Sequence, residues 1–179
     1  MRKKDGDDMS IDDPKRKLSA PLQQLMDEHI SLRDDMDRFY EIAEEIEYES
    51  GPKVVEQFNE LYHLVSAFNG KLAKHSKRED DGLFPMMSRH LGEEDRTIDT
   101  MEYEHQKAEQ HLRDFLDKAD QAGKSIDEDD AQIITVNAVQ AYATLTQHFA
   151  KEETKLFPLA DTILSYEEKE ELDRLFREN

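Results

Sequence analysis

The 179-residue chain contains no cysteine, which excludes disulfides, thiolate zinc sites, iron–sulfur clusters and cysteine nucleophiles together. Any metal must therefore be held by histidine, aspartate and glutamate. The chain also lacks a run of about 18 apolar residues, the length that a membrane-spanning helix needs. Residues 2–4 are basic like the start of a signal peptide, but no apolar stretch follows them. We therefore expect a cytoplasmic protein without a membrane partner.

Basic residues are few: 24 Lys and Arg stand against 43 Asp and Glu, which gives a formal net charge of -19. A field of this sign repels phosphate backbones, so we expect no nucleic-acid partner. The sequence shows no obvious second apolar face that would serve an interface. Together with the acidic surface, this favours a monomer.

Apolar residues recur at alternating spacings of three and four in four separate stretches, the pattern of helices packed in a bundle. The four seams are Leu22, Leu25, His29, Leu32, Met36, Phe39, Ala43 and Ile46; Phe58, Leu61, Val65, Phe68, Leu72, His75 and Glu79; Ile98, Met101, His105, Ala108, Leu112, Phe115 and Ala119; and Ile134, Ala138, Ala141, Leu145, His148 and Glu152. No stretch shows sustained strand alternation. The predicted fold class is all-α, an antiparallel up-down-up-down four-helix bundle.

Turn and capping residues predict where the first two helices begin and end. The first helix begins after Ser19 and ends at residues 50–52, a Ser-Gly-Pro sequence. The second helix ends at Gly82 and Pro85. Residues 82–92 then form a connection whose apolar side chains cap one end of the bundle.

The third helix is expected to begin near Glu93 and to close at residues 122–123, an Ala-Gly pair. Capping boxes at residues 125–128 and 165–168 predict the start of the fourth helix and of a short fifth one. Pro158 is expected to stop the fourth helix. The expected organisation is a flexible charged tail at 1–17, the bundle with its metal site at 18–160, and a C-terminal helix packed on the bundle at 161–179.

Two stretches share the pattern His-x-x-x-Glu-[DE]-x-x-Leu-Phe-Pro, at residues 75–85 and 148–158. Residues four apart lie on one face of a helix, so each copy can aim an imidazole and a carboxylate at one point. The other two seams each contain one histidine, His29 or His105, which follows a glutamate and has a phenylalanine ten residues on. Duplication of a helical hairpin is a hypothesis that accounts for this repetition.

Four helices thus present six ligand-type residues on their inward faces: His29, His75, Glu79, His105, His148 and Glu152. Burying these groups without partners costs several kcal/mol for each charged one, and a bound cation removes that cost. Six N and O ligands exceed a tetrahedral zinc site, whereas two metals about 3.5–4 Å apart need bridging carboxylates. We interpret the set as a dinuclear non-haem iron centre in which Glu79 and Glu152 are candidate bridges.

The pattern H…HxxxE…H…HxxxE resembles that of the hemerythrin-like (HHE cation-binding) domains, with all six positions present between about residues 20 and 160 and Leu-Phe-Pro after each acidic run. The resemblance implies an antiparallel four-helix bundle that holds two iron ions joined by an oxo or hydroxo bridge. It implies that His29 and His75 serve one iron, that His105 and His148 serve the other, and that both glutamates bridge. It also implies small ligands, such as O2, NO or H2O2, at an open iron position.

The sequence departs from the oxygen-carrying members of that family at position 109, where they have a histidine and this chain has Glu109. Two interpretations stay open, because Glu109 is either a seventh, oxygen ligand one turn from His105 or a solvated residue beside the site. As a ligand, a carboxylate would make the centre harder and favour ferric iron. That shifts the expectation from oxygen carriage towards sensing, peroxide or NO chemistry, or oxidase-like turnover.

Three functions remain open from the sequence alone. The first is a non-haem di-iron protein that interacts with O2, NO or peroxide as a sensor, a scavenger or a protein of iron and oxygen handling. The second is an oxidase or peroxidase that turns over at the same centre, and the third is a metal-free helical interaction module. A ferritin-like site needs Glu-x-x-His pairs; residues 60–63 and 102–105 fit, but the fourth helix has none.

Overall fold

The structure is a computed structural model that describes residues 17–178, so the tail expected at 1–17 lies, apart from Lys17, outside the described residues. Within this part of the chain every regular element is helical. The elements are α1 (Ala20–Tyr48), α2 (Pro52–Arg78), η1 (Glu79–Leu83), α3 (Phe84–Leu91), α4 (Thr97–Ala122), η2 (Gly123–Ser125), α5 (Glu128–Lys151), η3 (Glu152–Leu156), α6 (Phe157–Ile163) and α7 (Tyr166–Glu178). The all-α bundle and its short C-terminal helix are confirmed.

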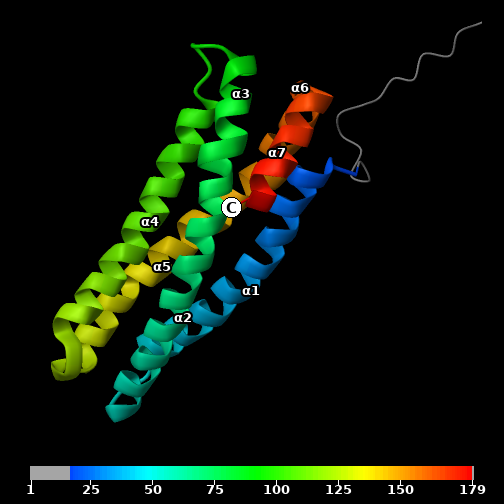
Figure 1. Cartoon of the computed structure of the whole chain (residues 1–179). Coiled ribbons are helices and arrows are strands. Elements are labelled where there is room, and N and C mark those ends of the chain that lie inside the picture. The colour runs from blue at the N-terminus through cyan, green and yellow to red at the C-terminus, as the bar shows by residue number, and fades with distance from the viewer. Residues whose placement is uncertain (1–16, 179) are drawn as a thin grey trace, which may run out of the picture.

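Four long helices form the bundle, with α1 packed against α2 and α5, and α4 packed against α5 and α2 (Figure 1). All residues of the four predicted seams are buried. The alternation of three and four therefore located the core face of each helix. Among the described helices, none is long and apolar enough to cross a membrane.

The prolines do not end the second and fourth long helices, contrary to prediction. Instead, α2 continues through the π-helical turn η1 into α3, and α5 continues through the matching turn η3 into α6 (Figure 1). In each turn a backbone N–H bonds the carbonyl five residues back, from Phe84 to Glu79 and from Phe157 to Glu152. A proline in a regular helix would clash with the carbonyl four residues earlier, and the wider turn before Pro85 and Pro158 relieves that clash.

Two predicted helix starts are also wrong. The helix α4 begins at Thr97 rather than near Glu93, after a turn in which Asp95 accepts a hydrogen bond from the Thr97 N–H at 2.7 Å. The helix α5 is capped by Asp127, which accepts from a backbone N–H three residues on, whereas Ser125 bonds a carbonyl behind it. An aspartate competes well with serine as a cap, and the sequence contained both.

The capping box that opens α7 is confirmed. The Ser165 N–H donates to the Glu168 carboxylate at 2.9 Å, and the Glu168 N–H donates to the Ser165 hydroxyl at 3.2 Å. The helix α7 then packs on α1 and on η1, with Leu172 and Phe176 buried. A Cβ at Gly82 would lie 2.9 Å from Leu172 Cδ1, so this glycine permits close approach of α7 and does not end a helix.

The bundle core is divided into two apolar clusters. One cluster fills the half of the bundle that contains the α1–α2 and α4–α5 connections, and it includes Phe39, Phe68 and Phe115. The other joins the start of α1 to α3, α6 and α7, and includes Phe84 and Phe157. Along each long helix, the site histidine lies at the boundary between the two clusters. A layer of buried polar groups therefore crosses the whole bundle at one level.

Candidate metal centre

The six predicted ligands meet in this layer. Their exposed fractions lie between 0 and 4 %, so all six are cut off from bulk water. Their ligand atoms form two groups, and within each group the atoms lie within 4.8 Å of one another. The first group is His29, His75, Glu79 and Glu152; the second is Glu79, His105, His148 and Glu152. Both carboxylates belong to both groups.

Each shared carboxylate divides its two oxygens between the groups. Glu79 places Oε1 3.4 Å from the His75 Nε2 and Oε2 3.2 Å from the His105 Nε2. Glu152 places Oε2 3.2 Å from the His29 Nε2 and Oε1 3.0 Å from the His148 Nε2. A carboxylate placed in this way faces two histidine pairs at once, which is the arrangement that a bridge between two cations requires.

The other ring nitrogen of each histidine contacts a second carboxylate, and we call these four residues the outer carboxylates. The Nδ1 atoms of His29 and His75 lie 2.9 Å from Glu153 and 2.8 Å from Glu28. In the other group, each Nδ1 lies 3.0 Å from its partner; the pairs are His105 with Asp80 and His148 with Glu104. An ionised carboxylate only accepts, so each Nδ1 carries a proton, and Nε2 is the nitrogen that faces inward and would bind a metal once it has no proton.

Carboxylates on both sides shift the pKa values of the site. Burial alone lowers the pKa of His75, but the charge of Glu79 and the hydrogen bond to Glu28 raise it to about 10. Burial likewise opposes a rise at His105, where Asp80 and Glu79 raise the pKa to about 10. Burial raises the pKa of Glu79, but the attraction of the His75 charge outweighs it and the net shift is downward. The layer thus favours positive charge at its centre.

Three outer carboxylates are themselves paired with a basic side chain. Arg33 donates to Glu153 Oε1 from Nε at 3.3 Å and from Nη2 at 3.1 Å. Arg78 lies 3.3 Å from Glu28 in an ion pair, and Lys151 forms an ion pair with Glu104. Arg33, one helical turn after His29, thus holds an outer carboxylate of the site. The tyrosines Tyr62 and Tyr142 donate to Asp120 and Asp37, away from the site.

Aromatic rings wall the site. Phe149 stacks on His29 with ring centroids 4.1 Å apart, and Phe157 lies 5.4 Å from the same ring. In the other half Phe84 stacks on His105 at 5.4 Å. These rings exclude water and so strengthen the electrostatic interactions inside the layer.

The residues present fit a bound cation. Six buried atoms of the layer have no hydrogen-bond partner: both carboxylate oxygens of Glu79 and of Glu152, and the Nε2 atoms of His105 and His148. The Nε2 atoms of His29 and His75 lie 3.0 Å apart, so without an extra proton two lone pairs face each other. Unsatisfied buried polar atoms of this kind are costly, and cations bound between them would satisfy all of them together.

The other candidates are not among these grouped ligand atoms. Glu109 is half-buried on α4 and belongs to neither group of ligand atoms. The glutamates and the histidine of the ferritin-like template, Glu60, His63 and Glu102, are exposed, so that arrangement is excluded. His90 contacts Glu168 at 2.8 Å and ties α3 to α7.

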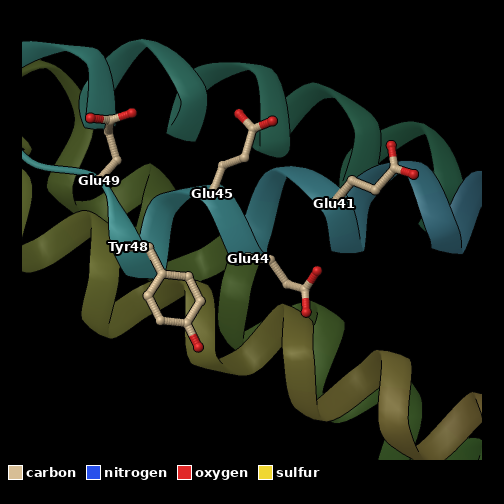
Figure 2. A pocket seen from close by; sticks show the side chains of 5 residues that line it. All are labelled: Glu41, Glu44, Glu45, Tyr48 and Glu49. Atoms are coloured by element: carbon tan, nitrogen blue, oxygen red, sulfur yellow. The ribbon is translucent and has the colours of Figure 1, made fainter.

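An acidic hollow of about 540 Å³ lies further along α1, lined by Glu41, Glu44, Glu45, Tyr48 and Glu49 (Figure 2). Its carboxylates come from a single helix and point outward in different directions (Figure 2). The nearest of them follows His29 by twelve residues, or about 18 Å of helix. This hollow is an open, solvated surface and contains no histidine.

The role of the outer carboxylates was missed at the level of sequence, although the signal was present. Glu28 and Glu104 directly precede His29 and His105, and Asp80 and Glu153 directly follow Glu79 and Glu152. Each therefore lies on the helix of one ligand and supports the histidine of another helix. In each repeated Glu-His or Glu-[DE] pair, one residue is a candidate ligand and the other is an outer carboxylate, so both residues of all four pairs belong to the network.

The fold and the site together define a class, the four-helix bundles that bind cations through inward-facing histidines and carboxylates. Within that class, the family model that matches is the hemerythrin HHE cation-binding domain, over residues 20–160. The chain therefore belongs to the hemerythrin HHE cation-binding family. A comparison with individually curated proteins gave no match.

Proposed function

We propose that this protein is a non-haem di-iron protein that binds O2, NO or peroxide at an open iron position and acts in sensing, scavenging, or iron and oxygen handling. The observation that carries the proposal is the division of each carboxylate: Glu79 and Glu152 both face His29 or His75 with one oxygen and His105 or His148 with the other. Two cations, each with two imidazoles and a share of both carboxylates, account for every ligand atom.

The donor set favours iron over zinc. A structural zinc site is closed by four ligands in a tetrahedron, whereas imidazole and carboxylate together suit iron. Each group here supplies four ligand atoms, fewer than an octahedral iron takes, so positions remain for a bridging oxo or hydroxo group and for a small ligand. When bound, iron supplies redox and Lewis-acid chemistry that no side chain of this cysteine-free protein has.

The side chains around the site have separable roles. The outer carboxylates orient the four imidazoles and hold the proton on Nδ1, and the phenylalanines keep the layer dry. Because the ligands are almost fully buried, only small molecules reach them without rearrangement. That restriction supports O2, NO or peroxide as partners in preference to a protein or a large substrate.

Metal analysis with optical spectroscopy tests the proposal. Protein purified aerobically without chelators should contain about two iron atoms per chain and show near-ultraviolet oxo-bridge bands, and the reduced form should change its spectrum on addition of NO. Fewer than about one iron per chain, without those bands, would contradict the proposal and favour a metal-free helical module. Catalytic loss of added peroxide would identify the protein as an enzyme, and an adduct with O2 that reverses under vacuum would identify it as a carrier.

A further inference from the structure

The two halves of the site share the same pattern of ligands and outer carboxylates, but they differ at two neighbouring positions. Arg33 and Glu109 correspond, since each lies four residues after the lone histidine of its helix, His29 or His105. Phe149 and Ser76 correspond as well, since each directly follows a histidine of the His-x-x-x-Glu pattern. The two halves therefore differ in charge at one position and in size at the other.

The side chains of the His29 half close that half from outside. Arg33 donates twice to Glu153, which in turn contacts the Nδ1 atom of His29. The Arg33 guanidinium also lies over the Phe149 ring, 5.6 Å from its centroid, and that ring stacks on His29. Phe149 thus holds one face of the His29 ring, and Glu153, which Arg33 holds in place, fixes its Nδ1 atom.

The His105 half has fewer restraints: Phe84 stacks on His105 at 5.4 Å, as Phe157 lies beside His29, but the half has no counterpart of Phe149 or of Arg33. Its outer carboxylate, Asp80, has no Lys or Arg within ion-pair distance in the part of the chain that the structure describes. The Asp80 side chain is 40 % exposed, against 16–25 % for the other three outer carboxylates. His105 is itself the most exposed of the four imidazoles, at 4 %.

Ser76 adds a second, independent difference. Where Phe149 fills space in the His29 half, Ser76 offers only a small side chain, and it is 98 % buried. Its hydroxyl oxygen has no hydrogen-bond partner. A buried hydroxyl without a partner has an oxygen of the kind that hard cations prefer, and serine is much smaller than the phenylalanine at the corresponding position.

We infer that metal ions enter and leave the site through the His105 half, past Asp80, Glu109 and Ser76, and that Arg33 and Phe149 keep the His29 half closed. The inference rests on the proposed function, because it concerns the exchange of the two ions. An uncompensated acidic surface raises the local concentration of cations and so speeds their uptake. An imidazole whose outer carboxylate is not tied to a cation swings aside more readily, which speeds both uptake and release.

Substitutions that reverse the charge at position 33 or at position 109 test the inference. Full-length protein is stripped of metal and loaded with Co2+, whose visible bands report binding, and the ions are then removed with excess EDTA. Glu109→Arg places in the His105 half the residue that closes the His29 half, so uptake and removal should both slow by about two- to fivefold, the effect of one partly exposed ion pair. Arg33→Glu should speed removal by a similar factor.

Glu60→Arg, an exposed position about 22 Å of helix from His75, changes the net charge as Glu109→Arg does and should leave both rates unchanged. Unchanged rates in both Glu109→Arg and Arg33→Glu, or equal slowing in both, would overturn the inference while the proposed function stands. Wild-type protein that binds no Co2+ would overturn both. Circular dichroism confirms that each variant is folded, and if Glu109→Arg is not, the response of Arg33→Glu decides the matter.

Discussion

Removal of the metal should lower the stability of this protein more than loss of any single core side chain. Six buried ligand atoms have no hydrogen-bond partner within the protein, four on the two carboxylates and two on imidazoles. At about 1 kcal/mol each, the lower end of the usual range for an unsatisfied buried group, they represent up to about 6 kcal/mol that bound cations recover, and less where a protonated imidazole pairs with Glu79. This is comparable with the entire net stability of a typical domain, about 5–15 kcal/mol.

Binding linkage gives a similar magnitude by another route. A ligand at one hundred times its Kd stabilises the folded state by about 2.7 kcal/mol, so two such ions contribute about 5.4 kcal/mol. For a domain of this length, 1 kcal/mol shifts Tm by about 2–4 °C, so EDTA should lower Tm by about 10–20 °C. Thermal unfolding followed by circular dichroism, with and without EDTA, measures this shift.

Matched variants separate a metal effect from general destabilisation. His75→Ala and Glu152→Ala remove a ligand and should abolish most of the EDTA-dependent shift, along with one or both ions. His63→Ala removes an exposed histidine and should retain the full shift. A wild-type Tm that moves by less than about 2 °C when the metal is shown to be removed would refute the reasoning, and so would equal shifts in the three variants.

Three further results are expected. The imidazoles of His75 and His105 have a pKa of about 10 without metal, so both are protonated at pH 7 and each must release a proton to bind a metal ion. Calorimetry in buffers of different ionisation enthalpy should therefore show at least two protons released per chain, and metal affinity should fall as pH falls. Metal binding without proton release would contradict the assignment of these histidines as ligands. Gly82→Ala should lower the free energy of unfolding in urea by about 1–3 kcal/mol, because the added Cβ meets α7. Gly70→Ala, which has open space around it, should leave that free energy unchanged or raise it slightly. Equal effects of the two substitutions would show that α7 does not pack on Gly82. Asp127→Ala should lower the free energy of unfolding by about 1 kcal/mol, and Ser125→Ala should lower it by less. The reverse order would show that Ser125, not Asp127, caps α5.

The helix seams and the meeting of the six candidate ligands could be predicted because both depend on periodicity. A histidine that takes the place of leucine at a core position, such as His29 in its seam, must be buried once the helix packs, whatever the details of the loops. Four such substitutions at the same level of four helices leave little freedom in where the side chains meet. The division of the core into two apolar clusters follows from the same fact.

The course of the chain beyond the ligands could not be predicted, because local rules for glycine and proline have more than one structural solution. Pro85 ends a regular helix by clashing with the preceding turn, but one π-helical turn removes the clash and the helix continues. From the sequence, Gly82 is expected to end a helix, whereas in the structure it leaves room for α7 to pack closely. Both outcomes are decided by tertiary packing, which a single-sequence rule does not contain.

The repeated acidic positions were visible in the sequence, but which histidine each outer carboxylate contacts could not be predicted, for a different reason. Glu28 supports His75, and Asp80 supports His105, so each acts on a residue of another helix. Sequence spacing relates side chains within one helix, and the pairing between helices follows only when their rotation and register are known. The lack of a Lys or Arg beside Asp80 among the described residues, on which the exchange route depends, is likewise a property of the assembled bundle.

The most direct test of the central claim is the number of metal ions bound by one chain, measured by native mass spectrometry together with elemental analysis on protein that has never met a chelator. The account predicts two iron ions in the wild type and fewer than two in Glu152→Ala, because each bridging carboxylate serves both ions. A single ion in the wild type, or two ions retained at full occupancy in Glu152→Ala, would contradict it.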